Sequence, residues 1–486
     1  MTGSPRRISL AQMTTALRHV TSINDLSNEE VERVFDLARR FLSELGDTRL
    51  KGRARGRAAS QRIGRSAHTG AGSILANLFY EPSTRTRLSF ESAMLRLGGG
   101  TITSADPASS SAAKGESLAD TVRVVSSYAD AIVIRHPRDG AAKLAAEYAS
   151  VPVINGGDGA HEHPTQTLCD LFTLSREKNK LKNLNVVISG DLRGSRTIHS
   201  FVYALARFGA NIMPMPGAKG MELPAHVDWR LRNEFHCRPV AGRESSVDAA
   251  YVTAVEPHQL SLMASPDVEL DVKLKKGVDV VYVTRFQKER WADQKQEYMK
   301  VDTKFLKDNR YKHSSVLHPL PRVGELDIAL DKNKRAAYFQ QASYGVPIRM
   351  ALISMLLDFD AEHALQKFES GFAAGEYALY EQPRKTGIRC ANPNCIVHDA
   401  QEGVYTANRF HFIPAKPPRL RCFYCETDIE NALAGHRRSR HYEAASAGLA
   451  PAGTRRLKDV IFFADSAQAK AAGYSPGRAA AKAASA

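Results

Sequence analysis

The sequence predicts an α/β fold with two doubly wound parallel-sheet domains, a functional site between them, and a small C-terminal β domain that binds zinc. Two observations support the first part: short apolar runs are followed by polar loops and helical patterns, and this order recurs in two separate halves of the chain. A third observation supports the zinc-binding domain: four of the six cysteines stand near the C-terminus in two closely spaced pairs.

Length and composition indicate a globular protein. A chain of 486 residues is long enough for about three domains. No uninterrupted apolar run reaches the length of a membrane-spanning helix, and the basic N-terminus is not followed by the apolar core of a secretory signal. Six cysteines are too few for a disulfide scaffold, which favours a reducing compartment. We therefore expect a cytoplasmic protein that does not bind membranes.

The net charge of +15 is concentrated in two segments. Residues 49–65 carry seven Lys or Arg and no acidic residue, and residues 431–486 carry nine against three. Thirteen of the fifteen excess charges lie there, so the rest of the chain is nearly balanced. A nucleic-acid-binding role would have to rest on these two segments, because the remainder lacks a basic surface composition.

The first 72 residues predict one packing helix and one basic insertion. Ser27-Asn-Glu-Glu30 is a capping box. Residues 47–72, rich in Arg, Gly, Ala and Ser, predict a solvated insertion rather than an RNA contact. The apolar face expected for the helix consists of Val31, Val34, Phe35, Ala38, Phe41, Leu42 and Leu45.

The stretch Ser83-Thr-Arg-Thr-Arg87 is the first candidate for an anion site. It follows an apolar run of strand length at 73–80 and precedes a helical pattern that Gly98 ends. The first N–H groups of a helix lack intrahelical partners, and the helix dipole favours an anion there. A helix cap needs a single hydroxyl, whereas this stretch offers three hydroxyls and two guanidinium groups, which suit a phosphate.

Further predicted strands end at polar residues in the same way. Residues 131–134 lead to Arg135, and residues 151–154 lead to His163. Ligands of doubly wound sheets collect at the carboxyl ends of the strands. In the second half, strands are expected at 185–190 and 279–283, before Arg196 and Arg285 respectively. The sequence after residue 190 lacks the full glycine fingerprint, so no dinucleotide cofactor is expected.

The motifs described above, and further ones along the chain, resemble those of the aspartate and ornithine carbamoyltransferase family and occur in the same order, over about residues 15–360. The resemblance implies a carbamoyl-phosphate-binding domain at 1–165, to which a helix at 345–364 returns, and an aspartate-binding domain at 166–344. The motifs that carry it are Ser83–Arg87, Arg135-His136-Pro137, His163-Pro-Thr-Gln166, Gly190-Asp191 through Arg196-Thr197, Thr284–Gln287 and His318-Pro-Leu-Pro-Arg322.

The resemblance also implies roles for individual residues. Thr86, Arg135 and His163 would stabilise the oxyanion that develops when an amine attacks carbamoyl phosphate. Neither a protein nucleophile nor a catalytic cofactor is expected. The expected catalytic residues are Arg85, Thr86, Arg135, His163 and Gln166. The expected substrate-binding residues are Ser83, Thr84, Ser110, Lys114, Arg196, Arg285, Gln287, Pro319 and Leu320, with Ser110 and Lys114 supplied by a neighbouring subunit of a catalytic homotrimer.

The second substrate is expected to be L-aspartate. Its two carboxylates need several cations, whereas the ammonium of ornithine needs an acid. By resemblance, Arg196, Arg285 and Gln287 match aspartate-binding positions, and Lys114 would add a further cation. Pro319 stands where the ornithine enzymes carry a cysteine. The implied reaction gives N-carbamoyl-L-aspartate and phosphate in de novo pyrimidine synthesis. Two alternatives remain: a carbamoyltransferase for another amine such as ornithine, or a zinc-ribbon nucleic-acid-binding protein with an inactive enzyme body.

The C-terminal cysteines predict a structural Zn²⁺ site. Their spacing, C-x4-C and then C-x2-C, supplies four thiolates and leaves no ligand position open; they are Cys390, Cys395, Cys422 and Cys425. Residues 386–430 resemble the zinc domain of the aspartate carbamoyltransferase regulatory chain, fused here after a linker at 365–385. This implies an assembly role, with trimers that pair through the zinc domain.

Residues 431–486 form an alanine-rich basic tail. Two expectations stay open for it: disorder, or a small strand at 460–463 with a helix at 467–474. No nucleic-acid partner is assigned to it.

Overall fold

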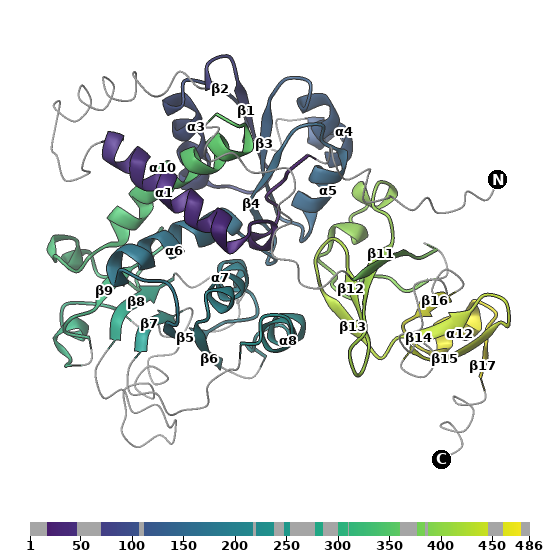
Figure 1. Ribbon diagram of the computed structural model, residues 1–486. Helices are drawn as coiled ribbons and strands as arrows, with labels where there is room; N and C mark the ends of the chain where they lie inside the picture. Colours follow the sequence, from purple (N-terminus) through teal and green to yellow (C-terminus); the bar gives the residue numbers. More distant parts are fainter. Residues whose placement is uncertain are drawn as a thin grey trace.

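The computed structural model describes most of the chain and shows two parallel-sheet domains, a zinc domain and a small C-terminal module (Figure 1). The described residues are 17–45, 70–105, 111–216, 220–237, 247–252, 278–284, 300–309, 311–359, 377–383, 387–445 and 460–477. No helix within these ranges combines the length and the apolar character needed to cross a bilayer.

The first domain is built on a four-stranded parallel sheet in the order β2-β1-β3-β4. Alternate residues of its strands face opposite sides. Leu75 and Val133 contact one core, together with helices α1, α3, α6 and α10, whereas Ala76 and Ile132 contact a second core with α4 and α5. The elements are α1 (Asn28–Leu45), β1 (Ile74–Phe79), α3 (Thr84–Arg96), β2 (Gly100–Ser104), α4 (Leu118–Val125), β3 (Ala131–His136), α5 (Ala141–Tyr148), β4 (Val153–Asp158) and α6 (Pro164–Lys178).

The second domain contains a five-stranded parallel sheet in the order β6-β5-β7-β8-β9. Both sheets are parallel, and β1, β3, β4, β5 and β8 are largely buried, which is the two-domain α/β fold that the sequence predicts. The elements are β5 (Asn185–Gly190), α7 (Arg196–Arg207), β6 (Asn211–Pro216), α8 (Ala225–Asn233), β7 (Val247–Val252), β8 (Val278–Val283) and β9 (Ser315–Leu317).

Two helices join the N-terminal and C-terminal parts of the enzyme body. The capping box of α1 is present, because Ser27 Oγ accepts from the Glu30 amide at 3.1 Å and Glu30 Oε2 accepts from the Ser27 amide at 2.7 Å. Helix α10 (Tyr338–Leu356) packs against α1, α3 and α6. It therefore returns to the first domain as expected, but it begins seven residues earlier than predicted and contains Pro347.

The zinc domain starts earlier than the sequence indicated. Its sheet has the order β10-β11-β12-β13, and β10 (Ala378–Glu381) lies in the stretch predicted as a linker. This corrects the linker boundary of 385: β10 is ordered by pairing with β11 (Arg409–Ile413), a strand far along the chain. The other strands are β12 (Arg419–Cys422) and β13 (Asp428–Glu430), with short 3-10 helices at Ile396–His398 and Glu402–Val404.

The C-terminal module is folded where the structure describes it: of the two expectations for this tail, the strand at 460–463 is present, and the helix lies at Ser466–Ala471 instead of 467–474. Tyr442, Ile461, Phe463 and Tyr474 form a small core of their own. The neighbouring Phe462 stacks on Phe412 of the zinc domain with ring centroids 6.0 Å apart. The elements are β14 (Leu433–His436), β15 (His441–Ala444), β16 (Val460–Phe463), α12 (Ser466–Ala471) and β17 (Ser475–Pro476).

The zinc domain shares a continuous core with the first domain. Ile388, Cys395 and Tyr424 belong to the same buried cluster as Ile132 and Ala142. Polar contacts border this core. The backbone of Asp139 bonds to Asn394 O at 3.2 Å and to Ile396 N at 2.9 Å. Glu426 also forms ion pairs with Lys143 of α5 and Arg230 of α8, so this domain contacts both halves of the enzyme body.

Candidate active site

A cavity of about 1090 Å³ lies between the two parallel-sheet domains. It is reached by the carboxyl ends of β1, β3, β4, β5 and β8 and by the loop after β9. Every predicted site residue of the enzyme body that the structure describes lines this cavity, with the exception of Lys114. These lining residues are Ser83, Thr84, Arg85, Thr86, Arg135, His163, Gln166, Arg196, Pro319 and Leu320.

The N-terminus of α3 forms the floor of a phosphate-sized cradle. Ser83 precedes the helix in an extended conformation, and its hydroxyl makes no capping hydrogen bond. The Ser83 hydroxyl therefore does not accept from the first backbone N–H groups of α3. These N–H groups have no partner within the helix and can donate to an anion in the cavity. Arg85 Nη2 donates to the carbonyl of Leu320 at 2.5 Å, which joins this helix to the loop of the second domain.

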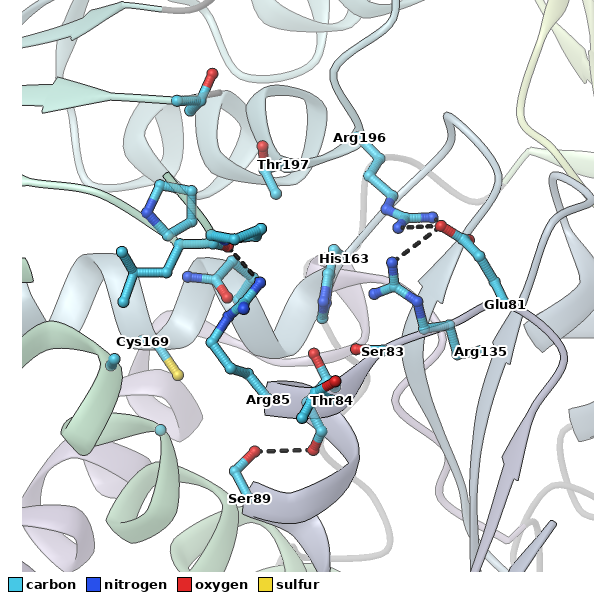
Figure 2. A pocket seen from close by; sticks show the side chains of 18 of the residues that line it. Glu81, Ser83, Thr84, Arg85, Ser89, Arg135, His163, Cys169, Arg196 and Thr197 are labelled. Atoms are coloured by element: carbon cyan, nitrogen blue, oxygen red, sulfur yellow. Dashed lines mark hydrogen bonds and ion pairs between the residues drawn. The ribbon is translucent and has the colours of Figure 1, made fainter. Parts of the chain in front are cut away.

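Glu81 holds two of the predicted cations together (Figure 2). Its Oε1 accepts from Arg135 Nη2 at 3.0 Å, and its two oxygens accept from Arg196 at 2.9 and 3.0 Å. Burial raises the pKa of Glu81, but the hydrogen bonds and charges of Arg196 and Arg135 outweigh it, so this pKa lies below its ordinary value. Burial and the charge of Arg196 lower the pKa of Arg135 to about 10, so Arg135 remains cationic at neutral pH.

His163 lies between Arg85 and Arg135 in the view of Figure 2. Burial and the charges of Arg135, Arg196 and Arg349 hold the pKa of His163 well below its ordinary value. The imidazole is therefore neutral at physiological pH and can donate one N–H into the cavity. Gly157 makes this close arrangement possible, because a Cβ at its φ of +113° would lie 3.2–3.3 Å from Arg135, His163 and Arg196.

Gln166 and the loop after β9 also line the cavity. Gln166 Nε2 donates to Asp170 Oδ1 at 2.8 Å. The loop is held by His318, whose Nδ1 accepts from the amide of Leu320 at 2.8 Å and whose Nε2 lies 2.7 Å from Glu325. The carbonyls of Pro319 and Leu320 are thereby fixed as candidate hydrogen-bond acceptors.

The remaining predicted residues are not placed in this cavity. Lys114 lies in an exposed 3-10 helix at Ser111–Lys114 and does not line the cavity. Ser110, Arg285 and Gln287 lie outside the described residues. Their roles stay predictions.

Sequence reasoning missed several charged or polar residues of the cavity wall, among them Glu81, Arg349 and Asn394. Glu81 carried a local signal, since an acid stands directly before the anion-binding stretch. Arg349 is buried in α10, where its Nη1 donates to the carbonyl of Gly345 at 3.0 Å. Asn394 comes from the zinc domain, and its Nδ2 donates to Asp139 Oδ1 at 2.9 Å. Only the tertiary structure brings it to the site.

The four C-terminal cysteines form a metal-binding centre. All four are buried, none is in a disulfide, and their Sγ atoms all lie within 4.8 Å of one another. The Sγ distances of 3.4 Å between Cys390 and Cys425 and 3.9 Å between Cys395 and Cys422 bracket the ~3.8 Å expected for sulfurs around a tetrahedral zinc. Four thiolates fit a structural Zn²⁺, because they would occupy all four tetrahedral positions and leave none open for water or a substrate.

Fold and site together define an enzyme of two parallel-sheet domains that binds an anionic substrate between them. Models of the aspartate/ornithine carbamoyltransferase family match both domains: the carbamoyl-P binding domain at 18–176 and the Asp/Orn binding domain at 182–356. The chain belongs to this family. The model of the metal-binding domain of the aspartate carbamoyltransferase regulatory chain matches residues 385–433.

Similar proteins agree with this assignment. The aspartate carbamoyltransferase catalytic subunits of Picrophilus torridus and Methanocaldococcus jannaschii are 43% and 42% identical, over 70% of this chain and 97% and 98% of theirs. The structure of the M. jannaschii catalytic subunit superposes with a TM-score of 0.54 at 37% identity, covering 71% of this chain and 99% of that one. Trypanosoma cruzi aspartate transcarbamoylase in complex with carbamoyl phosphate and aspartate has a TM-score of 0.53 at 28% identity, covering 70% and 96%.

Proposed function

We propose that this protein transfers the carbamoyl group of carbamoyl phosphate to the amine of L-aspartate, giving N-carbamoyl-L-aspartate and phosphate, a step of de novo pyrimidine synthesis. The observation that carries the proposal is one cavity that combines the N-terminus of α3 with Arg135, His163 and Gln166. An anion-binding helix N-terminus next to the neutral imidazole of His163 and the largely buried guanidinium groups of Arg135 and Arg196 can polarise the carbonyl of an acyl phosphate.

The geometry supports a role for each residue. Ser83, Thr84, Arg85 and the first amides of α3 hold the phosphate. Thr86, Arg135 and the neutral His163 donate to the carbonyl oxygen, where negative charge develops as the amine attacks. Gln166 and the carbonyls of Pro319 and Leu320 accept from the carbamoyl NH2. The amine of the second substrate is the nucleophile, and the departing phosphate accepts its proton, so catalysis rests on orientation and electrostatics.

Arg196 supports aspartate as the acceptor. Its guanidinium lines the cavity and is held by Glu81 and by the carbonyl of Gly159 at 2.8 Å. A fixed, largely buried guanidinium suits a carboxylate through paired hydrogen bonds. The relatives named as aspartate carbamoyltransferases favour the same acceptor. We assign Arg285, Gln287 and the Lys114 of a neighbouring subunit to the remaining carboxylate contacts.

Carbamoyl transfer by the purified zinc-loaded protein, measured with aspartate and ornithine side by side, tests this function. We expect product with aspartate and none above background with ornithine. Product with ornithine alone would overturn aspartate as the acceptor, together with the assignment of Arg285 and Lys114 to its carboxylates. A folded protein that binds carbamoyl phosphate but uses neither acceptor would contradict the proposed activity.

We also propose a catalytic homotrimer with shared active sites, whose zinc domains pair trimers. Lys114 lies outside its own cavity although the resemblance assigns it to the site. The segments on either side of it carry exposed apolar side chains that soluble surfaces rarely gather. These are Leu88 and Leu95 of α3, Ile102 of β2, and Val124 and Tyr128 in and after α4. Contact between subunits would cover this face and bring Lys114 to a neighbouring cavity.

Mixing two inactive variants tests the shared site. Lys114→Ala and His163→Ala trimers are each expected to be nearly inactive. Hybrids reassembled from dissociated subunits should regain activity, because some sites then combine an intact Lys114 with an intact His163. A mixture of two Lys114→Ala preparations taken through the same steps is the control. Hybrids of the expected mass without recovered activity would show that each chain completes its own site.

A further inference from the structure

Asp170 is a buried acidic residue that the mechanism above does not use. It lies in α6, one helical turn after Gln166, and has no solvent exposure. It does not line the cavity, so it cannot contact a substrate there. Its position directly behind Gln166 makes it the support for that side chain.

The carboxylate of Asp170 accepts hydrogen bonds from three neutral groups of the described chain. Its Oδ1 accepts from Gln166 Nε2 at 2.8 Å and from Gln341 Nε2 at 2.9 Å. Its Oδ2 accepts from the hydroxyl of Tyr282 at 2.9 Å. These donors come from α6, α10 and β8, so the carboxylate joins three elements of both domains.

An ionised carboxylate can only accept, and this fixes which end of each glutamine faces it. With Nε2 of Gln166 bound to Asp170, the atom that Gln166 offers to the cavity is its carbonyl oxygen. The amide of Gln341 is oriented in the same way, and its Oε1 accepts from the backbone amide of His318 at 2.8 Å. His318 in turn holds the amide of Leu320.

Both sets of acceptors for the carbamoyl NH2 therefore depend on Asp170. One is the oxygen of Gln166, and the other is the pair of carbonyls at Pro319 and Leu320. Hydrogen-bond acceptors that are left without a donor penalise a substrate that lacks an NH2, whereas a pocket of the right shape alone discriminates weakly. The arrangement thus has the means to distinguish an NH2 from a methyl group of similar size.

We propose that Asp170 is a positioning residue that makes the site specific for a carbamoyl over an acetyl phosphate by orienting Gln166 and, through Gln341, the loop at 318–320. This rests on the proposed function, since it assumes that the cavity binds an acyl phosphate. Burial disfavours the ionised form of the Asp170 carboxyl group. Burial raises the pKa of Asp170 to about 7, even though the hydrogen bonds of Gln341, Gln166 and Tyr282 oppose the shift.

The test is the binding selectivity of Asp170→Leu, which is close to aspartate in shape but removes the acceptor of both glutamines, in the full-length zinc-loaded protein at pH 8, where Asp170 is ionised. Dissociation constants are measured by calorimetry for carbamoyl phosphate, acetyl phosphate and inorganic phosphate. We expect wild type to prefer carbamoyl over acetyl phosphate and the variant to lower this ratio about tenfold, the effect of one misplaced hydrogen-bonding group. The affinity for inorganic phosphate should stay within about twofold, because the cradle at α3 does not involve Asp170.

Two further variants separate positioning from general damage. Tyr282→Phe removes one donor to Oδ2 and leaves both contacts of Oδ1, so its ratio should match that of wild type. In a Gln166→Ala background, Asp170→Leu should lower the ratio much less than it does in wild type, because its main target is gone. An unchanged ratio in Asp170→Leu, an equal loss of phosphate affinity, or full additivity with Gln166→Ala would overturn the proposal. Failure of the proposed function has a different signature, namely a wild-type protein that does not bind carbamoyl phosphate or does not transfer it to aspartate.

Discussion

Replacing His163 by alanine is expected to lower kcat for carbamoyl transfer by about 100- to 1,000-fold, the usual effect of removing one donor to a developing oxyanion. Its neutral imidazole faces the cavity among Arg85, Arg135 and Arg196. Its N–H donates to the developing oxyanion, and a water molecule in the space left by alanine would donate with poorer geometry. The affinity for inorganic phosphate should change little, because the phosphate cradle lies at the N-terminus of α3. Steady-state rates and phosphate inhibition on the same preparation measure both quantities.

His163→Gln is the matched variant for this prediction. Its side-chain amide can place a donor near the position of the imidazole N–H, so it should recover part of the rate that alanine loses. Thermal unfolding of both variants shows whether the buried position tolerates the change. A His163→Ala protein that is folded and within tenfold of wild-type kcat would remove His163 from the set of catalytic residues.

Loss of the zinc is expected to have the largest effect on stability. Cys422→Ser removes one of four thiolates, and structural zinc contributes about 10–16 kcal/mol to small metal domains. Because Cys395 and Tyr424 belong to the same core as Ile132 and Ala142 of the first domain, unfolding of the zinc domain exposes the α4 and α5 face of the enzyme body. A loss of only part of this energy, about 4 kcal/mol, would lower Tm by roughly 10 °C.

Cys237→Ser is the control for the zinc variant. Cys237 is equally buried, but its thiol donates to the carbonyl of Ala210 at 3.4 Å and lies outside the metal centre. The same substitution there should cost about 1–2 kcal/mol and leave one zinc per chain. Metal content and calorimetric unfolding measure the two effects separately. Equal Tm values for zinc-loaded and zinc-free protein would contradict the shared core.

Local patterns in the sequence predict much of the fold and the anion site. The stretch Ser83–Arg87 stands between an apolar run and a helical pattern, so its place at a strand-to-helix junction follows from periodicity alone. The zinc ligands follow from spacing, since two close pairs of cysteines restrict the geometry strongly. In the first case all the residues that cooperate are neighbours in the sequence, and in the second case the members of each cysteine pair are.

The parts that sequence reasoning missed depend on residues far apart in the chain. Glu81 gains its role from Arg135 and Arg196, which fold back to it from β3 and from the first turn of α7. β10 looked like a linker because a short strand is stable only beside its partner β11, about thirty residues later. The sequence left the fold of the tail open because its small core assembles from residues separated by a basic, alanine-rich stretch.

The placement of the zinc domain has a consequence for behaviour in dilute solution. The family model that matches residues 385–433 describes a domain of a regulatory chain, whereas here the same domain and the active site share one polypeptide. Its contact with α4 and α5 is therefore intramolecular, and a covalent tether keeps the two surfaces at a high effective concentration whatever the protein concentration is. Each active site thus has a zinc domain in fixed one-to-one stoichiometry, and Asn394 is present in the cavity wall of every chain without a prior encounter between separate subunits.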